Sequence, residues 1–332
     1  MNFSNPLTWS HSRIDVLNKC PRKYYYFYYS GYIKDAINPT QEQWDEYLRV
    51  LLFKNLKSVN MWVGTMSHTV ISNTLIAIHN GQSDLDRLVE AGFKGLAGRI
   101  KKEIADSKKK NYAKYDKNNK WGLLEHAFME EVEPEYVIDK FRTALKSFIK
   151  SAREDEVLNS AIEAIQVSKE NNFKCYIEDP DNKDWDSMRS SVEGIEIELH
   201  LLPDFYIERE RNRFLILDWK TGSPPEQKDE IPSQLKAYSL KILEETSELM
   251  KDDTKISGYY VYFPAEEKIG GDIEHQAINE VKDNIVNDIQ HQKSYLLNGD
   301  AIQNIPIAKK RFALTEDVDE CRYCNFKLIC NR

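Results

Sequence analysis

Apolar residues follow a helical period in the first half of the chain and a strand-like alternation in the second half. Between residues 82 and 172 they recur at helical spacing, for example at Phe141, Leu145 and Phe148, and no convincing strand interrupts them. From residue 194 onward the period changes, because isoleucine and leucine alternate with glutamate over residues 195–199. The pattern therefore predicts a mixed α/β protein with its strands in the second half.

The N-terminal region contains two strong local signals. Ser12-Arg13-Ile14-Asp15 resembles a capping box, so we expect Ser12 to begin a short helix that runs through Leu17. Pro21 either ends that helix or begins the next one. The aromatic run at 24–29 is interpreted as a buried segment that covers a core, with base stacking as the alternative.

Further elements follow from periodicity and from turn residues. The predicted helices span about 41–56, 66–78, 232–250 and 277–297, and the predicted strands span 204–207, 214–220 and 256–263. A charged turn at 208–213 joins the first two strands, and residues 204–207 continue the sheet that begins at 195. No repeat and no Gly/Ser- or Pro-rich linker divides the chain, so residues 1–332 are predicted to form one domain with a helical insertion at 82–172.

Composition and charge restrict the functional classes. The 332 residues are 41% hydrophobic and 30% charged, which is ordinary for a folded soluble protein. The net charge of −8 means that a nucleic-acid partner must be met by a local basic surface. The N-terminus has no secretory signal pattern and no stretch approaches the ~18 apolar residues of a membrane span, so we expect a cytoplasmic protein.

Two aspartates and a lysine form the sharpest chemical pattern. Asp204 is followed after a hairpin-length gap by Asp218 and Lys220. Residues two apart on a strand share a face, so Asp218 and Lys220 project together while Trp219 points to the other face. If the turn makes the two aspartates neighbours, they can hold Mg²⁺ or Mn²⁺ beside a phosphate, where the metal lowers the pKa of bound water. A surface salt bridge is the alternative for such a pattern taken alone.

Two further features add to this pattern. Gln234 and Tyr238 stand four residues apart, on one face of the helix that follows the strand, where they can reach a phosphate or a metal-bound water. His68 follows Gly64 by four residues on an apolar helix. A lone histidine in that setting is more often a satisfied core residue than a metal ligand.

The order of these features resembles the RecB-like branch of the PD-(D/E)XK nuclease superfamily. The resemblance covers about residues 8–75 and 194–332 and leaves the helical middle unmatched. The matching motifs are Gly64-x-x-x-His68, Asp204, Asp218-Trp219-Lys220-Thr221-Gly222 and Gln234-x-x-x-Tyr238, with Ser10-x-Ser12 and Cys20-Pro21-Arg22-Lys23-Tyr24 near the start.

The resemblance implies a restriction-endonuclease-like core, in which helices flank a mixed central sheet. It implies that the metal ligands are His68, Asp204, Asp218 and the backbone carbonyl of Trp219. Lys220 is then the catalytic lysine, and Gln234 and Tyr238 orient the substrate.

The cysteines are unevenly placed. Cys321-x2-Cys324-x5-Cys330 is a local metal signature that needs a fourth ligand, either Cys20 or Cys175. Four thiolates suit structural Zn²⁺ or an iron–sulfur cluster, and the spacing alone does not separate them. The resemblance to AddB-type and CRISPR-associated RecB-like exonucleases implies Cys20 as the fourth ligand and a [4Fe–4S] cluster that joins the two ends of the chain. Cys175 is then a buried or free thiol.

A lysine-rich segment is the candidate DNA-binding region. Residues 99–120 contain nine basic and three acidic residues, and aromatic residues interleave with the lysines. Basic and aromatic side chains together suit single-stranded nucleic acid, whereas a solvated flexible loop is the alternative. The candidate residues are Lys108, Lys109, Lys110, Tyr112, Lys114 and Tyr115.

These features predict a metal-dependent DNA nuclease, an exonuclease that prefers single-stranded DNA, acting in repair, recombination or defence. Because no Gly-rich phosphate-binding loop ending in Gly-Lys-Ser/Thr is present, any unwinding must come from a separate helicase or other partner. One alternative is a non-catalytic DNA- or protein-binding module that retains the fold. Another is a zinc-stabilised helical interaction protein whose acidic residues form salt bridges.

Overall fold

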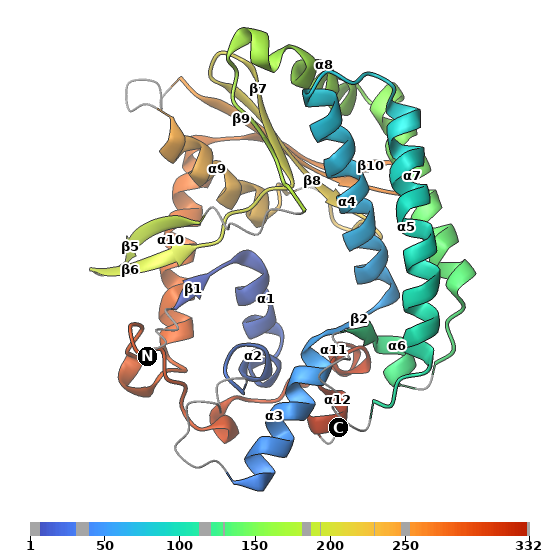
Figure 1. Cartoon of the computed structure of the whole chain (residues 1–332). Helices are drawn as coiled ribbons and strands as arrows, with labels where there is room; N and C mark the ends of the chain where they lie inside the picture. Colours follow the sequence, from blue (N-terminus) through green and yellow to red (C-terminus); the bar gives the residue numbers. More distant parts are fainter. Residues whose placement is uncertain are drawn as a thin grey trace.

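A five-stranded mixed sheet forms the centre of the molecule (Figure 1). The computed structural model describes residues 7–30, 40–112, 121–128, 130–180, 187–192, 194–228, 230–246 and 253–330. The strand order is β10-β9-β8-β7-β4, and only β8 and β9 pair in parallel. These strands are β4 (Cys175–Ile177), β7 (Phe205–Glu210), β8 (Arg213–Lys220), β9 (Lys255–Tyr262) and β10 (Glu267–Ile273).

Two smaller sheets accompany the central one. The three-stranded sheet has the order β1-β6-β5, and the two-stranded sheet pairs β2 with β3 in parallel. Their strands are β1 (Thr8–Trp9), β2 (Leu56–Lys57), β3 (Gly122–Leu123), β5 (Met188–Val192) and β6 (Ile195–Leu199).

Helices cover both faces of the central sheet (Figure 1). On one side lie α4 (Val59–His79), α5 (Leu85–Lys108), α7 (Pro134–Glu154) and α8 (Glu156–Asn171). On the other lie α1 (His11–Lys19), α9 (Ser233–Glu245) and α10 (His275–Lys293). The remaining helices are α2 (Pro21–Tyr28), α3 (Gln41–Lys54), α6 (Leu124–Ala127), α11 (Val318–Arg322) and α12 (Lys327–Cys330), with single 3₁₀ turns at Leu297–Gly299 and Lys309–Arg311. The predicted mixed α/β class is confirmed.

Alternation along β8 divides the core into two clusters. Leu215, Leu217 and Trp219 point toward α4 and α7, whereas Phe214 and Ile216 point toward α9 and α10. Successive side chains of a strand leave on opposite faces, which produces this division. Asp218 and Lys220 continue the second series, so both emerge on the α9 side.

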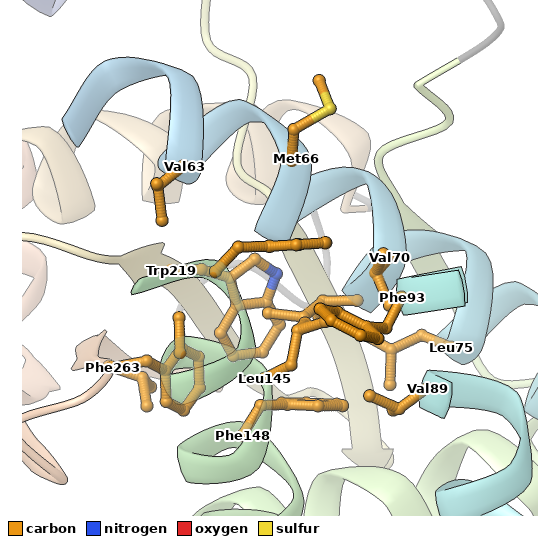
Figure 2. Close-up of a cluster of buried hydrophobic side chains, with 14 of the residues drawn as sticks. Val63, Met66, Val70, Leu75, Val89, Phe93, Leu145, Phe148, Trp219 and Phe263 are labelled. Carbon is orange, nitrogen blue, oxygen red and sulfur yellow. The ribbon is translucent and has the colours of Figure 1, made fainter. Parts of the chain in front are cut away.

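The helical segment 82–172 packs directly against the sheet. The Phe148 ring on α7 lies 6.4 Å from the Trp219 ring and 5.7 Å from the Phe263 ring (Figure 2). Val89 and Phe93 of α5 belong to the same cluster of buried side chains. These helices therefore support the strand that carries Trp219, and with it the position of the neighbouring aspartate.

The structure corrects several predicted boundaries. The residue that caps α1 is Ser10 rather than Ser12, because the Ser10 hydroxyl accepts the Arg13 backbone N–H. Strand β6 does not continue into β7 but pairs with β1 and β5 in a separate sheet. The turn predicted at 208–213 is only two residues long. Residues 208–210 still belong to β7, where the strand becomes exposed to solvent, and β8 begins at Arg213.

Six of the described strands were not predicted. Strands β1, β2 and β3 have two residues each and β4 has three, too few for a period to be recognised. Strand β5 has the polar sequence MRSSV, and the edge strand β10 contains charged residues and two glycines. A strand at the edge of a sheet tolerates such polar sequences because one side of it faces solvent.

The aromatic run at 24–29 lies in a core, as predicted. Tyr24 and Tyr26 of α2 are 0% and 2% exposed, and Tyr29, just after the helix, is 4% exposed. The Tyr26 ring lies 5.1 Å from the ring of Phe326, which belongs to the C-terminal segment. The described helices include none that is both long enough and apolar enough to cross a membrane.

Candidate active site

The β7–β8 hairpin brings Asp204 and Asp218 together. Phe205 pairs with Leu217 in antiparallel register, so the residues one step further out, Asp204 and Asp218, face each other across the strands. Asp204 Oδ2 accepts the backbone N–H of Trp219 at 2.7 Å. Both aspartates are buried, and they lie on adjacent strands, as the hairpin-length gap predicted.

Helix α4 delivers His68 to the same strand ends. His68 Nδ1 lies 3.3 Å from Asp204 Oδ1, and His68 Nε2 lies 2.9 Å from the backbone carbonyl oxygen of Trp219. A Cβ added at Gly64, one turn earlier, would stand 3.0 Å from Thr221 Oγ1. The glycine therefore allows the helix to approach the strand end closely, so His68 is a member of the site rather than an isolated core histidine.

Lys220, Gln234 and Tyr238 form a connected polar network on the α9 side. The Lys220 ammonium makes an ion pair with Asp218 and donates to Gln234 Oε1 at 3.5 Å. Tyr238 donates to Asp218 Oδ2 at 3.3 Å, and Gln234 Nε2 donates to the Tyr238 hydroxyl. Tyr260, absent from the predicted set, donates to Gln234 Oε1 at 2.6 Å, and its ring lies 4.2 Å from Lys220 Nζ.

Glu178 is an additional candidate ligand that the sequence did not reveal. One ligand atom each from His68, Glu178 and Asp204 lie within 4.8 Å of one another. Glu178 follows β4, and its backbone N–H donates to the Asp204 carbonyl at 2.9 Å. The sequence signal for β4 is weak, because its three residues, Cys175 to Ile177, are too few to show the alternation of a strand.

The buried charges of the site perturb one another. Burial raises the pKa of Asp218 to about 6, with Asp204 adding to the rise and Lys220 opposing it. Burial, together with Asp204, raises the pKa of Glu178 to about 7. Burial lowers the pKa of His68, but the Asp204 carboxylate outweighs it and raises that pKa to about 9. The carboxylates thus favour additional positive charge between them.

The donor set fits Mg²⁺ or Mn²⁺. Ligand atoms of His68, Glu178 and Asp204 lie together, the Trp219 carbonyl contacts His68, and the buried Asp218 carboxylate lies on the neighbouring strand. These groups form a hard, oxygen-rich set. We name His68, Glu178, Asp204, Asp218 and Lys220 together the carboxylate site. It opens into a cleft of about 830 Å³ that is lined by α4, by the loop after β8 and by Glu178.

Four cysteines line one small pocket near the junction of α1 and α2, where α1 ends. Cys20, Cys321, Cys324 and Cys330 all border it, and we call them the four-cysteine set. Cys20 begins α2, and the other three belong to the C-terminal segment. The segments are also joined by the Arg22 backbone N–H, which donates to the Ala313 carbonyl at 3.0 Å.

Cys175 does not belong to this pocket. It lies on β4, pairs with Ile207 and packs against the hydrophobic cluster beneath the central sheet. Burial raises the pKa of its thiol to about 11. The structure therefore places Cys20, and not Cys175, beside the C-terminal trio.

The candidate DNA-binding residues lie only partly in the described structure. Lys108 pairs with Glu133 at 3.0 Å, and Lys110 donates to the Trp121 carbonyl. Tyr112 is packed against Gly122 and bonds to Ser107. The side chain of Lys109 is exposed, whereas Lys114 and Tyr115 lie outside the described residues. Tyr112 thus has an internal contact in place of the free ring face expected for base stacking.

Comparison with known proteins assigns the fold family. The sequence model of the PD-(D/E)XK nuclease superfamily matches residues 8–331. The chain therefore belongs to the PD-(D/E)XK nuclease superfamily, whose members are typically metal-dependent nucleases that use Mg²⁺ or Mn²⁺. A solved structure titled "Crystal structure of SSO0001" is 18% identical, with 59% of this chain and 75% of that chain covered and a TM-score of 0.23. No curated protein matches the sequence.

Proposed function

We propose that this protein is a metal-dependent exonuclease of the RecB-like branch that degrades single-stranded DNA. The observation that carries the proposal is the convergence of His68, Asp204 and Asp218, with the Trp219 carbonyl, beside the Lys220 ammonium. These are the residues that the family motif matches, in one place and on three different elements.

The protein residues have separate roles in phosphodiester hydrolysis. His68, Glu178, Asp204, Asp218 and the Trp219 carbonyl would hold the divalent ion, which lowers the pKa of bound water and neutralises phosphate charge when bound. Lys220 positions the attacking water and stabilises the negative charge that develops on the phosphate. Gln234 and Tyr238 orient Lys220 and Asp218 through their hydrogen bonds, and so fix the direction from which the water attacks.

The cleft beside the carboxylate site has room for part of a nucleic-acid strand. Its volume is about 830 Å³, within the range of about 300–1,000 Å³ that is typical of pockets that hold small molecules. Helix α4 lines one side and residues 219–223 with Glu178 line the other, so a strand in the cleft lies beside the carboxylate site.

The four-cysteine set supports an iron–sulfur cluster as a second, structural group. Four thiols line one pocket between the N-terminal helices and the C-terminal segment, and none of the five cysteines forms a disulfide. Such a set also suits Zn²⁺. Visible absorption together with iron, sulfide and zinc analysis of anaerobically purified protein separates the two, because zinc gives no colour.

The nuclease proposal is tested by incubating the protein with labelled linear and circular single-stranded DNA, duplex DNA and RNA in Mn²⁺ or Mg²⁺. We expect linear single strands to be shortened from an end and circular strands to resist. Cutting of circles would replace exonuclease with endonuclease activity. Absence of divalent-dependent cutting on every substrate, by folded protein, would overturn the proposal in favour of a non-catalytic binding module.

A further inference from the structure

A second cavity, which we call the α1 pocket, adjoins the carboxylate site on the side of α9. It has a volume of about 390 Å³, and Glu178, Gln234 and Tyr238 form the wall next to the carboxylate site. Because Tyr238 donates directly to Asp218, one side chain separates the pocket from that aspartate, and Glu178 borders both the pocket and the cleft. The opposite wall is formed by residues 8–13, which comprise β1 and the start of α1.

Arg13 is a buried cation on this wall that lacks a counter-ion. Its side chain donates to Thr8 Oγ1 at 2.6 Å and to the Tyr24 hydroxyl at 3.1 Å, and the guanidinium lies 4.3 Å from the Tyr28 ring centroid. Among the residues that the structure describes, no carboxylate makes an ion pair with it, and its neighbours are the hydroxyl groups of Thr8, Tyr24 and Tyr29. Arg13 is 6% exposed, and a buried charge without a compensating charge is costly. A guanidinium in such a place is well suited to a phosphate.

The first turn of α1 adds further donors to the same pocket. The helix is nine residues long, and its N-terminal N–H groups and dipole favour an anion. Ser12 is exposed there, and its hydroxyl lies 3.3 Å from that of Ser10. His11 also lines the pocket, and burial lowers the pKa of its imidazole, with Asp15 opposing this and Lys220 lowering the pKa further.

We propose that the α1 pocket is a second phosphate subsite, in which Arg13 and the first turn of α1 hold a phosphate of the nucleic-acid strand other than the one being cleaved. This inference rests on the proposed nuclease function, because a strand lying across the carboxylate site continues into the adjoining pocket. Glu178 also faces the pocket, and its charge is directed to the metal site. An internal backbone phosphate and a terminal phosphate share the chemistry that Arg13 recognises.

Oligonucleotide binding in EDTA tests the subsite without any cutting. We expect Arg13→Gln to weaken binding of a fluorescent single strand about tenfold, as for loss of a charged hydrogen-bond donor. The salt slope should fall by about 0.7, the contribution of one phosphate. Arg13→Lys should restore part of the affinity. Ser12→Glu should weaken binding while preserving the fold, because a carboxylate at a helix start favours the helix.

Controls and substrates distinguish the possible outcomes. Asn18→Glu adds the same charge at the exposed far end of α1 and should leave binding unchanged. Equal dependence on Arg13 for 5′-phosphorylated, 5′-hydroxyl and circular strands identifies a backbone phosphate, whereas dependence confined to the phosphorylated end identifies a terminal one. Unchanged binding by folded Arg13→Gln and Ser12→Glu, while the wild type still cuts DNA, overturns the subsite alone. Arg13-dependent binding without cutting overturns the nuclease proposal alone.

Discussion

The carboxylate site and the four-cysteine set both gather side chains from distant parts of the chain, but the fold supports them differently. At the carboxylate site, hydrogen bonds already fix the partners, since Asp204 accepts the Trp219 N–H and His68 contacts the Trp219 carbonyl. The strand beneath them belongs to a five-stranded sheet with helices on both faces. This geometry does not require a metal to create it.

The four-cysteine set lies on much less regular structure. Helices α11 and α12, which carry its C-terminal members, are five and four residues long, too short to be stable alone. Burial raises the pKa of Cys330 to about 11, and the nearby Cys324 adds to the rise. The fold therefore positions the first site by itself, and we propose that the second site depends on a bound metal group to hold its short helices in place.

The largest expected effect is the loss of cutting in Lys220→Ala. Removing a preorganised group that stabilises developing charge typically costs about 100- to 1,000-fold in rate. The spectrum of the four-cysteine set should stay unchanged, because the contacts that Lys220 makes among the described residues belong to the carboxylate site and its neighbours. The unfolding temperature should fall, because the buried Asp218 loses its ion-pair partner, so cutting is compared on folded protein. Single-turnover cutting of labelled DNA measures the effect.

Lys228→Ala is the matched control, since Lys228 lies in the loop after β8 and pairs with Glu267 away from the carboxylate site. It should cut at the wild-type rate. A loss of activity equal to that of Lys220→Ala would show that the loop, and not the catalytic amine, controls the reaction.

The reverse pattern is expected for Cys330→Ala. It should remove the visible absorption and destabilise the protein by several kcal/mol, about 3–5 as for a long-range cross-link. The fraction that remains folded should cut DNA at close to the normal rate. Chemical unfolding and cutting assays on the same sample measure both quantities.

Cys175→Ala supplies the control for thiol loss, because Cys175 lies on β4 and outside the four-cysteine set. Its spectrum should match that of the wild type. If Cys330→Ala instead abolished cutting without changing stability, the division between a chemical and a structural site would be wrong.

The sequence predicted the parts of the carboxylate site that lie on regular elements. Period-two alternation placed Asp218 and Lys220 on one face, and the hairpin-length gap placed Asp204 opposite Asp218. The sequence did not reveal Glu178, which follows β4. This strand has only three residues and gains its strand conformation by pairing with β7. Likewise, the separation of β6 from β7 into two sheets depends on β1, whose two residues carry no period. Long-range pairing, rather than local preference, decides these elements.

A moderate effect is expected for Glu178→Gln, which tests the ligand that the sequence missed. Replacing a carboxylate by an amide removes a negative charge from the metal site, so the apparent affinity for Mn²⁺ should fall about tenfold or more. The rate at saturating metal should change less. Titration of cutting activity with Mn²⁺, together with direct Mn²⁺ binding, separates affinity from rate.

Glu196→Gln makes the same chemical change at an exposed position on β6 and should leave the metal affinity unaltered. An unchanged affinity in Glu178→Gln would restrict the metal ligands to the residues that the family motif supplies.

The smallest effect is expected from the lysines at the end of α5. Lys110 donates to the Trp121 carbonyl, and strand β3 begins directly after Trp121. Strand β3 pairs with β2, and Lys57 of β2 lines the cleft. We expect a bound strand that leaves the cleft past Lys57 to approach these lysines. Replacing Lys108, Lys109 and Lys110 by Ala should therefore weaken single-strand binding about two- to fivefold and flatten the salt slope, since each lost phosphate contact contributes about 0.7.

Lys94→Ala changes a lysine of the same helix that pairs with Glu90 and should not alter the slope. Stability should fall modestly in the triple variant, because the exposed Lys108 ion pairs contribute about 0–1 kcal/mol and the hydrogen bond from Lys110 to the Trp121 carbonyl about 1 kcal/mol more. A slope identical to that of the wild type would remove this segment from the DNA path. The carboxylate site and the α1 pocket would then account for the strand without any contact at the end of α5.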